Sequence, residues 1–480
     1  MSFTRLWAFL AIGLPVLAAM IAPFPSVDLT YHLRAGADIL DTRSIPSVDT
    51  WTFTVAGQPW LDQQWLAQAV MAAVFRIGGW TGLVILRAAL VGVAFGLLFD
   101  LCRRRAGSIR VAAWLTLVAF VCASITLGLR PQLFGIAIFA AVLWLVVRRH
   151  EERRFVWLVG PLVAAWANVH GSFVLAPLVV GIALVEDLVE RRRSWNLTAA
   201  LLATAIAATF LNPFGVEVWR YAAGISTNSV ITKRITEWQP TSPTTIEGAL
   251  FFASVALVII AVVVGARRGR RLPLTAYLWL VPFAAFGIWA VRGLAWWPFV
   301  AAMVVAPLAG APAISRTRAP REDPPLIRRL NIAIVAILAV VAVVALPLWR
   351  PLDQGLQAPV LVLGTAPSGI TGALREIVRP GDRILAPQPW GSWFEYAFPW
   401  ATVAVDSRIE LYPADVWNAI DGIEAGTPGW EEPIRNWDVT LIVAAPGQGA
   451  LVQRLTGAGW RDAFHDEDGT LLVRGDRSNA

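Results

Sequence analysis

Residues 330–348 read LNIAIVAILAVVAVVALPL, a run without a charged side chain. A run of this length and polarity can cross the hydrocarbon core of a bilayer as a helix. The arginine-rich segment from Arg316 to Arg329 precedes it, and a segment of ordinary soluble composition follows it. Because arginine-rich flanks stay in the cytoplasm, this helix is expected to start inside and to place the C-terminal segment outside.

The composition extends this membrane character to most of the chain. The 480 residues are 57% hydrophobic and 15% charged, with a mean hydropathy of +0.60, whereas soluble domains carry about 25% charged residues. This excludes a disordered or disulfide-rich chain and argues strongly against a soluble enzyme. The net charge is +7, and all basic residues except Lys233 are arginine. Because the arginines lie in short loops between apolar blocks, they predict membrane topology, not a nucleic-acid surface.

Two kinds of loop alternate between the apolar blocks. Loops rich in arginine are expected to be cytoplasmic, and loops with few charges extracytoplasmic. The alternation predicts a polytopic α-helical membrane protein of about eleven spans, with the N-terminus inside and the C-terminus outside. The first block, residues 6–24, is expected to be a retained helix and not a cleaved signal peptide. The arginine-rich loops are 103–110, 148–154, 191–193, 267–271 and 316–329, and the others are 128–132, 168–171, 212–248 and 291–293.

Two domains are predicted. Residues 1–350 form a transmembrane domain that includes an extracytoplasmic loop at 25–65, and residues 351–480 form a small extracytoplasmic α/β domain. Within the loop and just after it, residues 28–40 and 66–75 have helical patterns and residues 50–54 alternate like a short strand. In the tail, strand-like runs alternate with helix-like stretches at 369–378 and 449–456. These strand-like runs are 383–386, 402–405, 440–443 and 471–473.

The extracytoplasmic loop at 25–65 holds the densest cluster of polar side chains. Asp28 and His32 are four residues apart and therefore share one face of the predicted helix. Asp28 is a candidate general base towards a hydroxyl, with His32 beside it as a second catalytic candidate. Tyr31, Arg34 and Asp62 are candidates for binding a sugar or an acceptor. The alternative for Asp28 is a structural role, because acidic residues commonly stabilise the first turn of a helix.

Three further ionisable residues lie at the ends of spans in very short extracytoplasmic loops. Arg130, His170 and Arg292 would together suit a lipid phosphate, since such residues at membrane depth often have a function. The alternative for each is a side chain that reaches the interface or a helix end. In the longest of these loops, Glu237 and Trp238 could contact a sugar through a carboxylate and an aromatic face. The alternative for Trp238 is interfacial anchoring.

The tail contains two motifs with competing interpretations. Residues 406–408 (DSR) follow a strand, and an internal ion pair is favoured over a ligand-facing strand end. Residues 466–468 (DED) have the form of a metal-binding motif, but they precede Gly469 and favour a hairpin turn. The sequence has no phosphate-binding glycine loop. The two cysteines, Cys102 and Cys122, lack the spacing of a metal site or a disulfide framework.

These features resemble the GT-C superfamily of membrane glycosyltransferases, which includes dolichyl-phosphate-mannose–protein mannosyltransferases and bacterial lipid A aminoarabinose transferases. The likeness rests on the order of the segments. A first span is followed by a long outer loop that opens with an acidic residue, then by many spans and an outer tail. Several motifs are similar to those of a group of bacterial multi-span proteins. They are 28–34 (DLTYHLR), 58–66 (QPWLDQQWL), 130–134 (RPQLF), 167–171 (ANVHG), 212–215 (NPFG), 237–240 (EWQP), 390–393 (WGSW), 406–408 (DSR) and 411–412 (LY).

The resemblance implies an inverting transfer from a polyprenyl-phosphate-linked sugar to a glycan, lipid or protein acceptor, outside the bacterial cytoplasmic (inner) membrane. Asp28 matches the place of the catalytic acidic residue that the superfamily carries in its first loop. The protein mannosyltransferases carry an Asp-Glu pair there, whereas Leu29 follows Asp28 here. Nothing in the sequence demands a metal, although a divalent ion would be compatible with the chemistry.

Two other function classes stay open at this point. One is a transporter or flippase for a lipid-linked sugar, although no matching pair of broken spans supports it. The other is a non-catalytic envelope assembly protein that uses the tail for binding. We favour the glycosyltransferase, in which loss of Asp28 abolishes turnover, whereas a scaffold would still bind.

Overall fold

The computed structural model describes residues 1–310 and 323–475, which form two compact units. Unit 1 comprises Met1–Ala22 and the described residues of Leu83–Leu346, and unit 2 comprises Pro23–Gly82 and the described residues from Pro347 onward. The prediction that loop 25–65 belongs with the membrane spans differs from the structure, in which this loop belongs to the same unit as the C-terminal residues. Part of the predicted cytoplasmic loop 316–329 lies outside the described residues.

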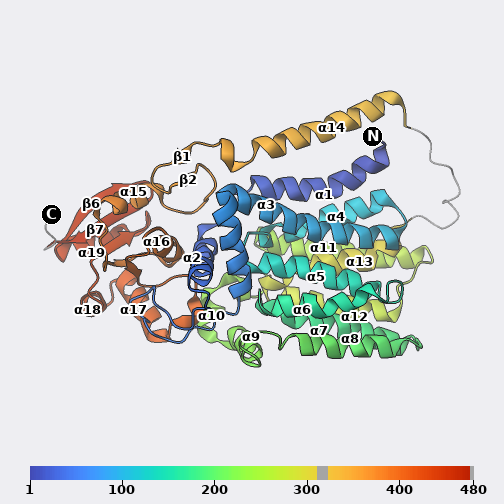
Figure 1. The fold of residues 1–480 in the computed structure, drawn as a ribbon, viewed down its shortest axis with the longest axis horizontal. Helices are drawn as coiled ribbons and strands as arrows, with labels where there is room; N and C mark the ends of the chain where they lie inside the picture. Colours follow the sequence, from blue (N-terminus) through green and yellow to red (C-terminus); the bar gives the residue numbers. More distant parts are fainter. Residues whose placement is uncertain (311–322, 476–480) are drawn as a thin grey trace. The chain divides into compact units, whose positions relative to one another are not determined.

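Unit 1 is made of helices that run side by side (Figure 1). The helix α3 (Trp65–Ala106) begins in unit 2 and continues into unit 1, and its backbone is broken at Gly79, where φ is 54°. The other helices of unit 1 are α1 (Phe3–Ile21), α4 (Ile109–Ala123), α5 (Pro131–Val147), α6 (Val159–Ala167), α7 (Leu175–Val189), α8 (Trp195–Ala208), α9 (Glu217–Thr227), α10 (Ser229–Arg234), α11 (Ile246–Arg267), α12 (Leu274–Trp289), α13 (Trp297–Ala309) and α14 (Pro325–Val344).

Six helical segments among the described residues are long and apolar enough to cross a membrane, and five shorter apolar segments have 10–17 residues. The membrane character predicted from the sequence is therefore present, while the number of spans, about eleven, stays a prediction. The long segments are Phe3–Ile21, Trp65–Ala106, Ile109–Thr126, Gly171–Val189, Ile246–Arg267 and Pro325–Val344.

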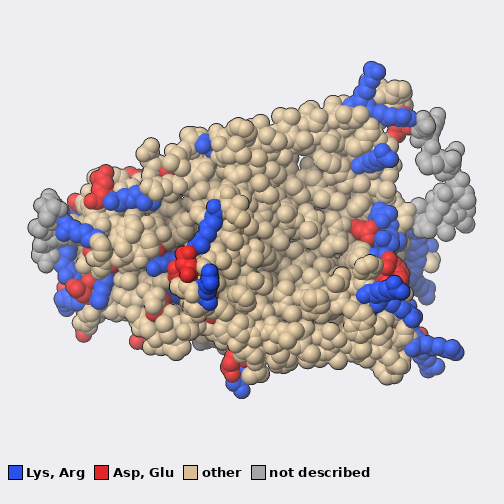
Figure 2. Space-filling model, viewed as in Figure 1, with Lys and Arg blue, Asp and Glu red and all other residues tan. Residues whose placement is uncertain are grey.

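The core of unit 1 is aromatic, whereas its outer helices expose apolar side chains. The Phe139 ring lies 5.2 Å from Trp296 and 5.8 Å from Phe283, centroid to centroid. On α11, in contrast, Leu257 and Ile259 are 54% and 58% exposed. Figure 2 shows a broad uncharged surface over these helices, with Lys and Arg gathered at one end. A surface of this kind is stable in lipid, where helices satisfy their own backbone hydrogen bonds.

Unit 2 contains a five-stranded sheet of order β4-β3-β5-β7-β6. β3 (Arg383–Leu385) pairs in parallel with β4 (Thr402–Val403) and β5 (Leu441–Ala444), and β7 (Gly469–Arg474) runs antiparallel to β5 and β6 (Trp460–Asp466). The helices of unit 2, besides the start of α3, are α2 (Ser26–Thr42), α15 (Ser368–Ile377), α16 (Gln388–Ala397), α17 (Ala414–Ala425), α18 (Glu431–Asn436) and α19 (Gly449–Gly457), and a short ribbon pairs β1 (Leu352–Asp353) with β2 (Ala358–Pro359).

The small α/β region predicted for the tail is confirmed, including its four strand-like runs and both helices. The strand β6 was not predicted, and its hairpin with β7 places residues 467 and 468 in the turn, as the hairpin interpretation expected. The strand expected at 50–54 was wrong, because Thr52 forms only an isolated bridge with Val403. Val403 belongs to β4, which has only two residues, so residues 50–54 have no longer strand there to pair with.

Candidate functional site

The helix α2 presents the acidic cluster that the sequence singled out. Asp28 lies in the first turn of α2, and its N-cap residue Pro25 offers no side-chain cap. His32 follows one helical turn later and is 2% exposed, and its ring lies 3.9 Å from that of Tyr31. Asp28 is half-buried. The helix therefore places a carboxylate, an imidazole and a phenol within two turns.

Gln68, near the start of α3, links His32 on α2 to Asp62, which precedes α3. Gln68 lies with its side-chain Nε2 2.8 Å from Asp62 Oδ1, to which it donates, and 3.3 Å from His32 Nδ1. Asp62 is 2% exposed. Burial raises the pKa of Asp62 to about 7, even though the hydrogen bond from Gln68 opposes this rise. Asp62 is thus poised to gain or lose a proton near neutral pH.

A buried arginine fixes the loop that precedes Asp62. Arg408 is 1% exposed, and its Nη2 lies 2.6 Å from Asp49 Oδ1 and its Nε 2.8 Å from Asp406 Oδ2. Its guanidinium lies 4.3 Å from the ring centroid of Trp51 and 4.6 Å from that of Trp60. The ion pair favoured for residues 406–408 is therefore present, and it extends to the first loop. Buried charges require such partners.

The helix α16 and the strand end after β4 support α2. Thr30 Oγ1 donates to the Ser392 carbonyl at 2.9 Å, and Ser407 Oγ donates to the Val27 carbonyl at 2.6 Å. Arg34 Nη1 donates to the Glu395 carbonyl at 2.7 Å, and its guanidinium lies 4.8 Å from the Trp51 ring. The C-terminal motifs therefore hold the helix that carries Asp28.

Glu395 is a fully buried carboxyl close to Asp406. Burial and the charge of Asp406 raise the pKa of Glu395 well above its usual value. Burial also acts on Asp406, but the adjacent Arg408 outweighs it and lowers the pKa of Asp406. Burial therefore favours the protonated form of Glu395, while Arg408 favours the ionised form of Asp406.

In unit 1, two arginines converge on one carboxylate. Arg130 is the N-cap residue of α5, and its Nη2 lies 2.5 Å from Glu237 Oε1. Arg292 lies in the single turn Val291–Ala295, and its Nε donates to Glu237 Oε2 at 3.1 Å. The Arg292 guanidinium also lies 4.6 Å from the Trp238 ring centroid. Residues far apart in the sequence thus form one oxyanion site with an aromatic wall.

The electrostatics of this site fix its charge state. Burial opposes ionisation of Glu237, but Arg130 and Arg292 outweigh it and lower the pKa of Glu237 to about 2. Burial, with the charges of Arg292 and Arg130, lowers the pKa of His170 to about 3. His170 Nδ1 accepts from the Ser172 backbone N–H at 3.1 Å. His170 is therefore neutral at physiological pH and offers one Nε2–H donor, not a charge.

Among the described residues, no group of three or more His, Cys, Asp or Glu side chains is arranged to hold a metal ion. Cys102 and Cys122 are buried and not disulfide-bonded. Three carboxylates of these sites are instead held by other side chains: Asp62 by Gln68, Asp406 by Arg408, and Glu237 by Arg130 and Arg292.

The structure sorts the predicted site residues into two groups. Unit 2 contains Asp28, Tyr31, His32, Arg34 and Asp62, and unit 1 contains Arg130, His170, Glu237, Trp238 and Arg292. Gln68 and Glu395 were not predicted, and neither was the pairing of Asp49 with Arg408. The contact of Gln68 with His32 spans 36 residues and that of Arg408 with Asp49 spans 359, so no local spacing could indicate them.

The sequence matches no protein-family model and none of the curated proteins. The fold is similar to that of the oligosaccharyltransferase of Archaeoglobus fulgidus in its apo form, with 13% identity, a TM-score of 0.51, and coverage of 92% of this chain and 69% of that one. Its complex with an inhibitory peptide and a dolichol-phosphate gives 11% identity, a TM-score of 0.51, and coverage of 93% and 70%. The chain therefore shares a fold with an archaeal oligosaccharyltransferase.

Proposed function

We propose that this protein is a GT-C-type inverting glycosyltransferase that moves a sugar from a polyprenyl-phosphate donor to an acceptor hydroxyl. The observation that carries the proposal is the convergence of Arg130 and Arg292 on the two oxygens of one half-buried carboxylate, that of Glu237. Two guanidinium groups aimed at one oxyanion form a site that also suits a phosphate. The similar fold of an archaeal oligosaccharyltransferase, solved with dolichol-phosphate, supports the choice of donor class.

The leaving group is assigned to unit 1. When the bond between the sugar C1 and the phosphate oxygen breaks, negative charge develops on the polyprenyl phosphate. Arg130 and Arg292 stabilise that charge, and the neutral His170 adds one N–H donor. Glu237 has to share or release the arginines when the phosphate binds. Glu237 and Trp238 then remain available to contact the sugar through hydrogen bonds and an aromatic face.

The acceptor is assigned to unit 2. The acceptor oxygen attacks the sugar C1 while Asp28 takes the hydroxyl proton, and the configuration at C1 inverts. His32, held by Gln68, is a positioning residue for Asp28 or for the acceptor. Tyr31, Arg34 and Asp62 complete the predicted sugar or acceptor contacts. Arg34 donates to the Glu395 carbonyl, so its contribution includes holding α2 in place.

The reaction is assigned to the outer face of a bacterial cytoplasmic membrane. The arginine-rich loops favour an orientation with the N-terminus inside and the C-terminal residues outside. A lipid-linked donor suits this compartment because it removes the need for a nucleotide sugar there. The acceptor is a glycan, a lipid or a protein.

The test is sugar release from a panel of polyprenyl-phosphate sugars by the full-length protein in nanodiscs. Wild type, Asp28→Asn and Arg292→Gln are compared with Asp41→Asn, an exposed carboxylate on the same helix as Asp28. We expect turnover of one donor by wild type and Asp41→Asn. Asp28→Asn should lose at least about a hundredfold in rate, the usual contribution of general base catalysis. Equal rates for Asp28→Asn and wild type would exclude Asp28 as the base, and no turnover of any donor by wild type would refute the proposal.

A further inference from the structure

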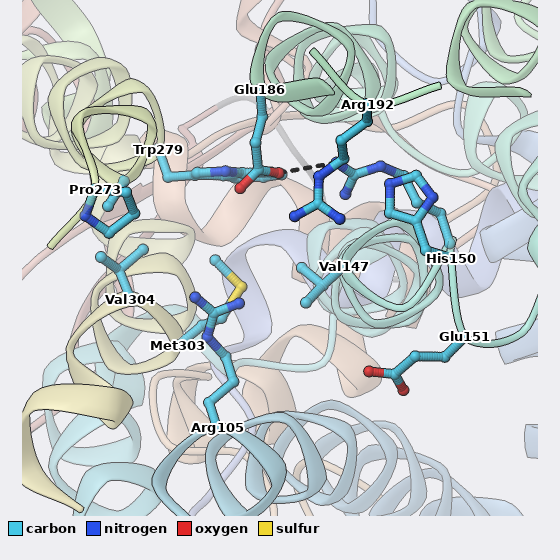
Figure 3. A pocket seen from close by; sticks show the side chains of 12 residues that line it. Arg105, Val147, His150, Glu151, Glu186, Arg192, Pro273, Trp279, Met303 and Val304 are labelled. Carbon is cyan, nitrogen blue, oxygen red and sulfur yellow. Dashed lines mark hydrogen bonds and ion pairs between the residues drawn. The ribbon is translucent and has the colours of Figure 1, made fainter. Parts of the chain in front are cut away.

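Unit 1 contains a pocket remote in sequence from the arginine site described above. It has a volume of about 280 Å³ and lies among α3, α5, α7, α12 and α13. Figure 3 shows the Arg105 side chain entering it from α3, opposite Glu186. A water molecule occupies about 30 Å³ in the liquid, so the pocket has room for a phosphate group and part of the molecule that carries it.

The lining of the pocket is divided between charged and apolar side chains. Its cations are Arg105, Arg149 and Arg192, with His150 beside them, and its carboxylates are Glu151 and Glu186. The apolar part is formed by Val147, Pro273, Ala276, Trp279, Met303 and Val304. A ligand that fits both parts is amphipathic, with an anionic group on an apolar stem.

Most of these charges already have partners. Arg149 Nη2 lies 2.6 Å from Asp187 Oδ1 and 3.0 Å from Glu186 Oε2. Arg192 Nη2 lies 2.6 Å from Glu190 Oε2. Glu151 is bound by Arg148, with an Nε–Oε2 distance of 3.1 Å. The lining carboxylates are therefore neutralised within the pocket or at its edge.

Arg105 differs from the other two lining arginines. It forms no hydrogen bond or ion pair with any residue that the structure describes. Its neighbours Arg103 and Arg104 both bind Asp100, at 2.6 Å each, and Asp100 is therefore shared by these two arginines. Arg105 is thus a guanidinium that enters the pocket with no hydrogen-bonded or ion-paired carboxylate of its own among the described residues, because Glu186, which faces it, is bound by Arg149.

The loops around the pocket favour an anion there. The arginines of loops 103–110, 148–154 and 191–193 outnumber the acidic residues of those loops, and Figure 2 shows Lys and Arg gathered at this end of the helices. Basic pockets between membrane helices are typical sites for phospholipid head groups. Guanidinium and phosphate also match in geometry, since two N–H groups can bind two oxygens.

We propose that this pocket binds a phosphate group, with Arg105 as its main ligand and the apolar wall against the stem that carries the phosphate. The group comes from the head group of an anionic phospholipid or from a soluble phosphate. The site is independent of the proposed sugar transfer, because none of its residues belongs to either group of candidate site residues.

The test compares full-length wild type, Arg105→Gln and Arg268→Gln in two kinds of nanodisc. One contains phosphatidylcholine alone, and the other contains phosphatidylcholine and phosphatidylglycerol in equal parts. Arg268 is the matched control, because it is an exposed loop arginine that does not line the pocket. We expect phosphatidylglycerol to raise the unfolding temperature of wild type and Arg268→Gln alike. Arg105→Gln should lose most of that gain and bind phosphatidylglycerol at least about tenfold more weakly.

Two further measurements decide the source and guard against misfolding. In detergent, inorganic phosphate is compared with sodium chloride of equal ionic strength. If inorganic phosphate raises the unfolding temperature of wild type but not that of the Arg105 variant, the result supports the site and assigns it to a soluble phosphate. Unfolding temperatures in phosphatidylcholine alone show whether Arg105→Gln folds, and Arg105→Met, which also removes the charge, is used if it does not. An Arg105 variant that folds and keeps the full phosphatidylglycerol gain, with no response to inorganic phosphate that depends on Arg105, would overturn the proposal.

Discussion

Replacing Asp62 by asparagine should remove a pH dependence from the stability of unit 2. Asp62 is buried with Gln68 as its hydrogen-bond donor, and burial raises its pKa from 3.8 to about 7. In the unfolded chain the same carboxyl titrates near its usual value. Between these two pKa values the folded protein holds a proton that the unfolded chain has released.

The sign and the size follow from this difference. Below about pH 4, Asp62 is protonated in both the folded and the unfolded state. Above about pH 4 the unfolded chain releases this proton while the folded protein keeps it, so the unfolding free energy of wild type falls as the pH rises to about 7. At about 1.4 kcal/mol per pH unit, the loss amounts to about 4 kcal/mol. Asparagine does not titrate and keeps an oxygen that can accept from Gln68. The unfolding free energy of Asp62→Asn should therefore not fall over this pH range.

Urea titrations of the full-length protein at about pH 4 and about pH 8 measure the effect. The quantity of interest is the change in unfolding free energy between the two pH values, because it cancels any constant effect of the new amide. Asp41→Asn, which removes an exposed carboxylate of the same unit, should behave as wild type. An Asp62→Asn variant with the same pH dependence as wild type would refute the reasoning.

Three further predictions concern other contacts. Arg408→Met should lower the unfolding free energy by about 3–5 kcal/mol in urea titrations, because it leaves Asp406 buried without its arginine; a loss below about 1 kcal/mol would contradict this. Gly36→Ala should lower the unfolding temperature, since its Cβ would lie 2.1 Å from the Gln68 carbonyl oxygen, and an unchanged temperature would show that α2 and α3 separate easily. Glu237→Gln should bind a polyprenyl phosphate about tenfold more tightly in calorimetry, because the phosphate no longer competes with a carboxylate for the arginines; weaker binding would mean that Glu237 orients them.

The sequence alone determined the membrane character of the chain and the structure of its tail. Long runs such as residues 330–348 admit only a helix in lipid, because backbone groups there must bond within their own segment. The strands β3, β5 and β7 were also predictable, since short apolar runs between turn residues are a local signal. The candidate residues Asp28, His32, Arg130 and Arg292 were found because ionisable groups stand out at the ends of apolar runs.

The tertiary structure decided which of these residues act together and in what charge state. Glu237 joins Arg130 to Arg292 although 107 residues separate the first pair and 55 the second, and no sequence period encodes such a distance. His170 was expected to be cationic or switchable, but its pKa of about 3 makes it a neutral donor. Asp62 reads as an ordinary carboxylate, yet its pKa is about 7. Burial and neighbouring charges set these properties, and both arise only when distant segments pack.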